Sequence, residues 1–363
     1  MLFLKLGVIG FGGPAAHIAL MREETVRRRR WLDDARFLDL LGMTNLIPGP
    51  NSTEMAMQLG ALRAGWAGLV LGGVCFILPA MLSVLALAWA YVAYGARPEA
   101  SAALYGIKPV IIAVVAQAAW SLGRTAVKDA GLAVVGAAVV ALYAAGADEL
   151  VLLFGAGLVV LVARGIRREH FLLLAPLSLA APAAPPAAAP AASLATLGLT
   201  FLKIGAVLYG SGYVLLAFLQ NDFVVRLGWL TERQLLDAVA IGQFTPGPVL
   251  TTATFIGYLV AGWVGGVLAT VAIFLPSFFY TALTRPLLPR LRGSPRAGAF
   301  LDGVNVAALG LMAAVTWQLG RAAIVDVPTA LLALIAAALL LWRGVNSAWL
   351  VLGGALVGLA LGR

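Results

Sequence analysis

TNLIPGPNSTE, residues 44–54, and GQFTPGPVLTT, residues 242–252, are two versions of one segment that decides the fold. In both versions a Pro-Gly-Pro triplet interrupts a stretch that otherwise suits a helix. Proline removes a backbone donor and glycine tolerates angles that other residues avoid, so the triplet breaks the helix. Because the flanking sequence is apolar, the break falls at membrane depth, where only protein or a water-filled cavity can satisfy the freed backbone. We therefore predict helix breaks at Pro48, Pro50, Pro246 and Pro248.

The whole chain repeats with an offset of 198 positions, which a deletion shortens to 197. A repeat of this size predicts two copies of one structural unit. The matching stretches include FLKLG (3–7) and FLKIG (201–205), AGW at 64–66 and 261–263, and WSLGR (120–124) and WQLGR (317–321). We divide the chain into a first repeat domain, 1–164, an Ala/Pro-rich linker, 165–196, and a second repeat domain, 197–363.

The composition is that of a membrane protein. Hydrophobic residues make up 62% of the chain and charged residues 11%, less than half of the roughly 25% usual in soluble domains. Apolar runs of about 18 residues or more recur along the chain, each long enough to cross a hydrocarbon layer of about 30 Å as a helix. This pattern excludes a soluble enzyme, a disordered chain and a disulfide-stapled secreted domain.

The charge and the rare residue types exclude further classes. A net charge of +9 does not indicate nucleic acid here, because basic residues of membrane proteins collect in cytoplasmic loops. The single cysteine, Cys75, excludes an intrachain disulfide, and the two histidines are too far apart in sequence to predict a metal site. No nucleotide-binding glycine-rich loop is present. We expect no metal, no cofactor and no nucleic-acid partner.

Each copy is predicted to contain a first helix, a broken amphipathic segment and four apolar helices. If the broken segment enters and leaves on one side, each copy crosses the membrane five times and the two copies face opposite ways. If it crosses, each copy crosses six times and the copies are parallel. The predicted ranges are 2–20 and 197–219 for the first helices, 36–62 and 234–259 for the broken segments, and, in the first copy, 65–93, 102–122, 130–146 and 149–163 for the apolar helices.

The arginines favour the inverted arrangement. Residues 21–36 hold six arginines and their counterpart, 219–234, holds two. The next connection reverses this, with Arg97 alone in the first copy against Arg285, Arg290, Arg292 and Arg296 in the second. Since cytoplasmic loops carry the basic excess, we predict an all-α polytopic membrane protein with two inverted repeats, each of about five transmembrane helices plus one broken, re-entrant segment. A parallel duplication is the alternative.

The two helix breaks predict an anion site. The helices that begin after Pro50 and Pro248 have free N–H groups and a dipole that favours a negative charge. Two such helix ends from opposed copies would meet near the middle of the membrane, as in inverted-repeat transporters. Local helix capping is the alternative for the side chains around them. The candidate ligands are Asn45, Gly49, Asn51, Ser52 and Thr53, with Gln243, Thr245, Gly247, Thr251 and Thr252.

Three lysines lie within the apolar sequence, where ionisable residues are costly and often functional. Lys5 and Lys203 occupy the same position in the two copies, and Lys108 aligns with Asn305. We predict that Lys5, Lys108, Lys203 and Asn305 contact the anion. For Lys5, extension of the side chain to the membrane surface is an equal alternative.

Two titratable residues are candidates for coupling or gating. Glu54 is the one acid of the first Pro-Gly-Pro segment, and the sequence leaves open whether it carries a proton or pairs with Arg63. His17 follows a glycine-rich stretch and could gate or couple near an anion path, or could simply be hydrogen-bonded. Gly12, Gly13 and Pro14, in that stretch, are candidates for a helix break or a close helix approach.

These motifs resemble the chromate transporter (CHR) family in its long, two-domain form. The resemblance rests on FGGPAAH (11–17), on WLDDARFLDLLGMTNLIPGPNSTE (31–54) and on the FTPGP (244–248) and AGW motifs of the second copy, and it extends over essentially the whole chain. By position, the family's motifs fall on Gly12, Gly13, Pro14, His17, Asn45, Pro48, Gly49, Pro50, Asn51, Glu54, Pro246, Gly247 and Pro248. The second copy departs from them at residues 209–212, YGSG in place of FGGP, so the glycine motif is not repeated there in full.

The resemblance implies a multi-pass protein of a bacterial or archaeal inner membrane that exports chromate, confers chromate resistance and draws on the proton-motive force. We therefore expect a secondary transporter, with chromate as substrate, protons as coupling ion and lipid around it. Transport of a related dianion such as sulfate and a passive anion channel are the alternatives. An enzyme is not expected, because one thiol and two separated histidines supply no cluster of reactive groups. Association into a homo-oligomer is compatible with the sequence and is not decided by it.

Overall fold

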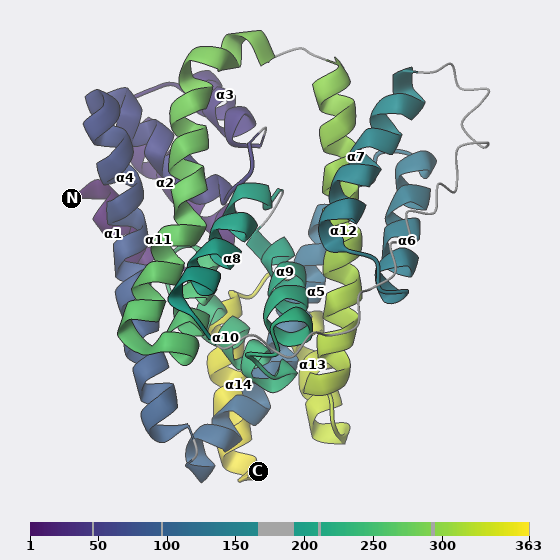
Figure 1. Ribbon diagram of the computed structural model, residues 1–363. Coiled ribbons are helices and arrows are strands. Elements are labelled where there is room, and N and C mark those ends of the chain that lie inside the picture. The colour runs from purple at the N-terminus through teal and green to yellow at the C-terminus, as the bar shows by residue number, and fades with distance from the viewer. Residues whose placement is uncertain (46, 96, 166–191, 210–211, 292–294, 363) are drawn as a thin grey trace.

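The computed structural model describes residues 1–45, 47–95, 97–165, 192–209, 212–291 and 295–362. All regular elements in these ranges are helical (Figure 1). Four helical stretches among them are long and apolar enough to cross a membrane: Asn51–Tyr94, Pro98–Ala126, Val249–Thr284 and Pro295–Ala323. The predicted all-α polytopic class is confirmed. Most of the predicted linker, residues 166–191, lies outside the described ranges.

The two halves contain equivalent elements in the same order. The first half consists of α1 (Leu2–Ile9), α2 (Gly13–Arg22), the π-helical η1 (Glu23–Arg28), α3 (Asp34–Thr44), α4 (Asn51–Tyr94), α5 (Pro98–Ala126), α6 (Ala130–Ala144) and α7 (Glu149–Gly165). The second half consists of α8 (Leu194–Val207), η3 (Gly212–Val214), α9 (Leu215–Leu219), η4 (Gln220–Arg226), α10 (Glu232–Phe244), η5 (Val249–Thr251), α11 (Thr252–Leu291), α12 (Pro295–Ala323), α13 (Val327–Ala338), η6 (Leu339–Arg343) and α14 (Ser347–Leu361).

The first helix of each copy is broken, so the prediction of a single helix over 2–20 and over 197–219 was wrong, although the break in the first copy falls at the candidate residues Gly12 and Gly13. In the first copy the helix stops at Ile9 and resumes at Gly13, because Gly12 and Gly13 adopt φ of +101° and +78°. These positive φ values are open to glycine and strained for other residues. In the second copy α8 ends at Val207, and Leu208 is extended with ψ of 101°.

α4 and α11 are each folded back on themselves. The helical path of α4 is interrupted at Ala64 and Gly65, and that of α11 at Ala261 and Gly262. On either side of the first interruption the arms touch, since a Cβ on Gly72 would lie 2.6 Å from the carbonyl oxygen of Ala56. The AGW motif of each copy is therefore the turn of a helical hairpin. Its short arm begins at the Pro-Gly-Pro triplet and its long arm spans the molecule.

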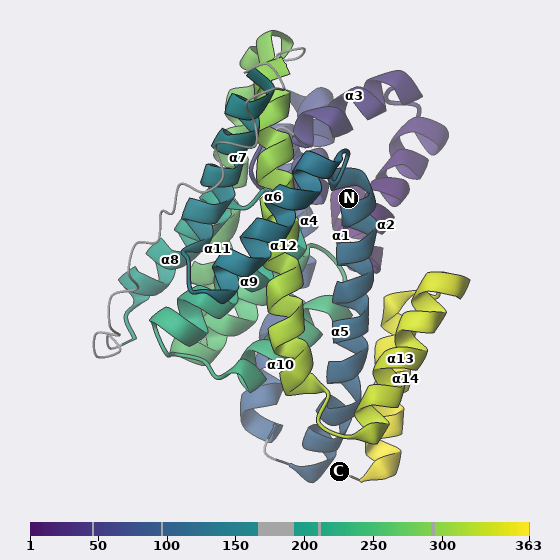
Figure 2. The same cartoon turned by 90° about the vertical axis from the view of Figure 1, so that its right-hand side faces the viewer.

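Equivalent long helices run in opposite directions. In Figure 1 the long arm of α4 descends from the end where α3 lies, whereas the long arm of α11 rises toward that end. α5 and α12 likewise run antiparallel (Figure 2). This observation supports the inverted arrangement, whose placement in a membrane stays a prediction.

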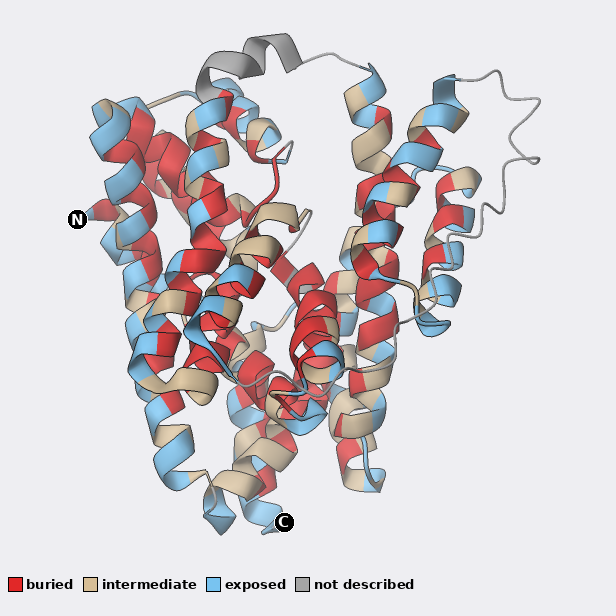
Figure 3. Ribbon diagram, in the orientation of Figure 1, coloured by how far each residue is buried: buried red, intermediate tan, exposed pale blue. Residues whose placement is uncertain are grey.

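The buried residues gather at the centre of the molecule and the exposed ones on the outer faces of the helices (Figure 3). The broken segments and short arms are largely buried, with Met55, Leu59 and Phe255 fully inside. The outer faces of the long arms expose large apolar side chains such as Trp66 and Phe279. In water such faces would be a liability, but they suit a surface that contacts lipid.

Candidate functional site

The helix breaks of the two copies are hydrogen-bonded to each other at two places. The N–H of Gly49, in the first Pro-Gly-Pro triplet, donates to the carbonyl of Leu208 at 2.7 Å, and the N–H of Gly247, in the second, donates to the carbonyl of Gly10 at 2.7 Å. Gly10 and Leu208 are equivalent positions, 198 residues apart. Each triplet is thus bound to the broken first helix of the other copy. We call this pair of hydrogen bonds the crossing point.

The crossing point leaves no room for a side chain on either glycine. Gly49 has φ of +138°, and a Cβ there would lie 2.5 Å from Oγ of Ser277 and against the carboxylate of Glu54. Gly247 has φ of +95°, and a Cβ there would lie 2.8 Å from Cβ of Ala80. Ser277 and Ala80 are themselves equivalent, 197 residues apart. The glycines are therefore required by close approach as well as by backbone angle.

Glu54 lies beside the crossing point without a partner. It is fully buried, and neither carboxylate oxygen has a hydrogen bond in the described chain. The hydroxyl of Ser277, which like Glu54 lies against Gly49, also has no partner in the described part of the chain. Arg63, the alternative partner for Glu54, instead lies 6.0 Å from the ring centroid of Trp31. A buried carboxyl of this kind is costly while charged and is most simply accommodated with a proton.

His17 is bound to the break of the first helix, at Gly10. Its Nε2 donates to the carbonyl of Gly10 at 3.0 Å, so Gly10 accepts from both His17 and Gly247. Because a carbonyl can only accept, a neutral His17 carries its proton on Nε2, and Nδ1 is left as a buried acceptor with no partner among the described residues. The imidazole also contacts the edge of Phe76, with ring centroids 5.4 Å apart.

A polar cavity of about 580 Å³ opens among the N-terminal parts of the first copy and helices α5 and α12. Its lining includes five predicted residues: Gly12, Pro14, Asn45, Asn51 and Asn305. Nδ2 of Asn51, at the start of α4, donates to Oδ1 of Asn45 at 2.5 Å. Residues of both copies therefore build this cavity.

Sequence reasoning missed several polar residues of the cavity. Gln117 and Ser121 lie four positions apart on α5, so they share one face of an otherwise apolar helix. That spacing was a usable signal.

An ion-pair network lies beside this cavity, which Lys128 and Asp302 help to line. Lys128 bonds to Asp302 at 2.7 Å, and Arg164 bonds to Asp302 at 2.6 Å and to Asp129 at 3.1 Å. The pKa of Asp129 lies below its usual value, mainly because the backbone N–H of Leu132 donates to its carboxylate and also because Arg164 bonds to it.

The three predicted lysines are already paired with carboxylates. Lys5 bonds to Glu24 at 2.7 Å, and this bond lowers the pKa of Glu24. The equivalent Lys203 bonds to Asp222 at 2.6 Å. In this conformation both lysines therefore join the broken first helix to the segment that follows it, away from the polar cavity.

Lys108 belongs to a buried cluster that also joins the two copies. Its Nζ lies 2.9 Å from Oδ1 of Asp237, and the hydroxyl of Tyr91 donates to Oδ2 of Asp237 at 2.9 Å. Asp237 is the one acid of the predicted segment 234–259, so its isolation in the sequence was a signal that we did not use. The position equivalent to Lys108 is Asn305, which lines the polar cavity.

The remaining predicted ligands are buried and mostly bonded locally. Thr245, Thr251 and Thr252 donate to carbonyls three or four residues earlier, so their hydroxyls are bonded within their own segments rather than as caps that accept from free N–H groups. Ser52 and Thr53 are buried in the first turn of α4, and Nε2 of Gln243 is buried with no partner in the described chain. The structure therefore brings the three asparagines together with Gly12 and Pro14, and leaves Gly49, Gly247 and the threonines of the second copy out of the cavity lining.

Comparison with known proteins agrees with this architecture. The family model described as Chromate transporter matches residues 1–161 and 195–359. A chromate transport protein of Cupriavidus metallidurans is 37% identical over 366 residues, which cover 99% of this chain and 91% of the relative. A probable chromate transport protein of Synechococcus elongatus is also 37% identical, over 92% of this chain and 87% of the relative.

A third relative, a chromate transport protein of Pseudomonas aeruginosa, is 34% identical over 90% of this chain and 82% of its own length. No solved structure matches the chain. The matched family is one of transporters and not of enzymes, as the sequence led us to expect. With both halves matched and the relatives covered nearly end to end, the chain belongs to the chromate transporter family.

Proposed function

We propose that this protein is a secondary transporter of an inner membrane that exports chromate by alternating access. The observation that carries the proposal is the crossing point, where each Pro-Gly-Pro triplet is bound to the broken helix of the other copy. Broken helices that meet at the interface of inverted repeats are typical of substrate sites in secondary transporters. The names of the relatives supply the substrate.

The polar cavity is the proposed entry site of the anion. Asn45, Asn51, Gln117, Ser121 and Asn305 line it and can donate hydrogen bonds to a tetrahedral oxyanion. The N-termini of α2 and α4 lie at Gly12 and Asn51, so their free N–H groups add a favourable field. With Lys5, Lys108 and Lys203 ion-paired, hydrogen-bond donors and helix ends are the main attraction for the anion in this conformation.

The two sides of the molecule differ in the way that alternating access requires. On one side Asn305 lines the open polar cavity. At the equivalent place in the other half, Lys108 is closed onto Asp237 and Tyr91. The arginine-rich residues 21–36 mark the cytoplasmic side, and the end of α3 contributes Asn45 to the cavity. We infer a conformation open to the cytoplasm, from which an exporter would load its substrate.

Glu54 is the proposed carrier of the coupling proton. It is buried beside the crossing point, and a neutral carboxylic acid is the form that this site accommodates best. Opening of the crossing point would expose the carboxyl to water and allow it to release the proton. His17, bound to the carbonyl of Gly10, is placed to respond to the same movement.

Flux measurements test the proposal. Purified protein in liposomes should move chromate when a proton gradient is imposed, and Glu54→Gln should uncouple or abolish that movement while the protein still folds. Glu23→Gln, a half-exposed acid on η1, is the matched control and should leave the flux unchanged. Absence of chromate movement, or wild-type coupling in Glu54→Gln, would contradict the proposal.

Sulfate is the second candidate, because it resembles chromate in size and charge. It enters the same assay as a competitor. Preferential sulfate flux would reassign the substrate and leave the mechanism intact, whereas flux that ignores the proton gradient would indicate a channel.

A further inference from the structure

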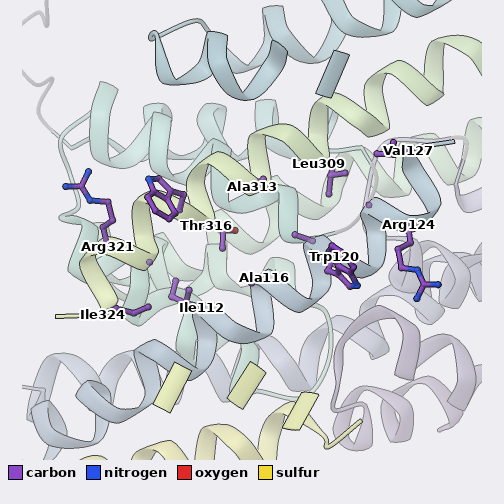
Figure 4. A pocket seen from close by; sticks show the side chains of 14 residues that line it. Ile112, Ala116, Trp120, Arg124, Val127, Leu309, Ala313, Thr316, Arg321 and Ile324 are labelled. Carbon is purple, nitrogen blue, oxygen red and sulfur yellow. The ribbon is translucent and has the colours of Figure 1, made fainter. Parts of the chain in front are cut away.

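An apolar groove of about 970 Å³ runs between α5 and α12, apart from the polar cavity (Figure 4). It is lined by fourteen residues, and every one of them has its equivalent among the fourteen, 197 positions away in the chain. The WSLGR and WQLGR motifs supply the most prominent pairs, Trp120 with Trp317 and Arg124 with Arg321. The groove is therefore a product of the repeat, and the proposed transport path uses neither its arginines nor its tryptophans.

Small residues form the floor of the groove. Ala116 and Ala313 are exposed in it. A Cβ on Gly123 would lie 3.4 Å from Leu309, and a Cβ on Gly320 would lie 3.6 Å from Ile112. α5 and α12 thus pass each other closely while their large side chains stand at the rims.

The arginines mark the two ends of the groove. Gly123 lies beside Leu309 and Gly320 lies beside Ile112, so the antiparallel helices place Arg124 and Arg321 apart (Figure 4). Twelve residues at about 1.5 Å each separate them by roughly 18 Å along the helix axes. With their long side chains extended, the two guanidinium groups can reach opposite surfaces of a bilayer whose hydrocarbon is about 30 Å thick.

The charged residues that line the groove are all positive. Arg124 and Arg321 are exposed, and in the described part of the chain no carboxylate lies within ion-pair distance of either. No acidic residue is among the fourteen that line the groove. Trp120 and Trp317 are 66% and 73% exposed, so their rings are free to contact a bound molecule.

We propose that the groove binds anionic phospholipid, one molecule from each leaflet, with the phosphate at Arg124 or Arg321 and an acyl chain along the alanine and glycine floor. A cation at the end of an apolar trough complements an anionic head group on an apolar tail. A second copy of this chain fits less well. If two copies packed groove to groove, the arginines of both would face a lining that contains no acidic residue. Leu309 lines both the groove and the polar cavity, so a bound lipid would contact the wall of the proposed substrate path.

Native mass spectrometry of the full-length protein tests this proposal, with phosphatidylglycerol and phosphatidylcholine as the probes. We expect tighter binding of phosphatidylglycerol, weakened about fivefold for each arginine replaced in Arg124→Gln and Arg321→Gln. Arg343→Gln is the matched control. Like Arg124, it is an exposed arginine at the end of a helix next to an exposed tryptophan, Trp342, but it lies outside the groove.

A second variant keeps the charges and fills the trough. Ala116→Trp with Ala313→Trp should reduce phosphatidylglycerol binding as well, since the acyl chain would lose its place. Equal binding of the two lipids by the wild type, or unchanged binding in both the arginine and the alanine variants, would overturn the proposal. A dimer that disappears in the alanine variant would assign the groove to a second copy instead. Because lipid binding is read without substrate, these outcomes are independent of chromate transport.

Discussion

At the scale of single residues, Gly49 is the position least able to change. Its φ of +138° suits glycine alone, and a methyl group would meet Ser277 and Glu54. We expect Gly49→Ala to destabilise the protein by about 2–5 kcal/mol from backbone strain and overpacking. The measurement is thermal unfolding in detergent. Gly65→Ala is the control, because φ there is +58° with open space around it, so only about 1 kcal/mol of backbone strain is expected. Equal effects of the two substitutions would contradict the close approach.

Some of the site residues could be predicted from the sequence and others could not. Asn45, Asn51 and Asn305 could be predicted to line a site, because amides are out of place in apolar sequence unless they meet a polar partner. The pairing of Lys5, Lys108 and Lys203 could not be predicted, because a lysine gives no sign of which distant carboxylate it meets. Glu54 could be singled out by its isolation, but its distance from Arg63 is a property of the folded chain.

At the scale of elements, the structure is set by where helices stop. The breaks at the two Pro-Gly-Pro triplets could be predicted, because proline and glycine act locally. The hairpin turns at the two AGW motifs could not, because a tight turn there depends on Gly60 and Gly68 meeting across the arms. The hydrogen bonds of the crossing point were equally out of reach, since each joins segments from different halves.

The contact between α5 and α10 gives a prediction at this scale. Lys108→Ala and Asp237→Ala should each lower transport strongly, because either change leaves one buried charge unpaired at a cost of about 3–5 kcal/mol. The exchange Lys108→Asp with Asp237→Lys should restore part of the flux if the pair acts as a gate. Arg22→Ala is the control, since its ion pair with Asp34 is exposed, lies outside the polar cavity and is worth little. If Lys108 instead contacts the anion, the exchanged pair will stay inactive while Lys108→Arg retains transport.

At the scale of the whole molecule, the repeat predicts two conformations related by exchange of the halves. In the present one, Gln117 lines the open polar cavity, and its equivalent, Ala314, is buried. In the other conformation the roles should reverse, with the Lys108–Asp237 contact open and the Asn305 side closed. Inverted repeats would place the two openings on opposite sides of the membrane.

Cysteine labelling in intact cells and inverted vesicles distinguishes these conformations. In a Cys75→Ser background, Gln117→Cys should react with a membrane-impermeant thiol reagent from the cytoplasmic side. Ala314→Cys should react only from the outer side, and faster while chromate is being transported, because its exposure requires the exchanged conformation. Ala56→Cys, fully buried in the short arm of α4, is the control and should stay unlabelled. Labelling of both test positions from one side would mean that the copies are parallel, and the crossing point would then need a mechanism other than alternating access.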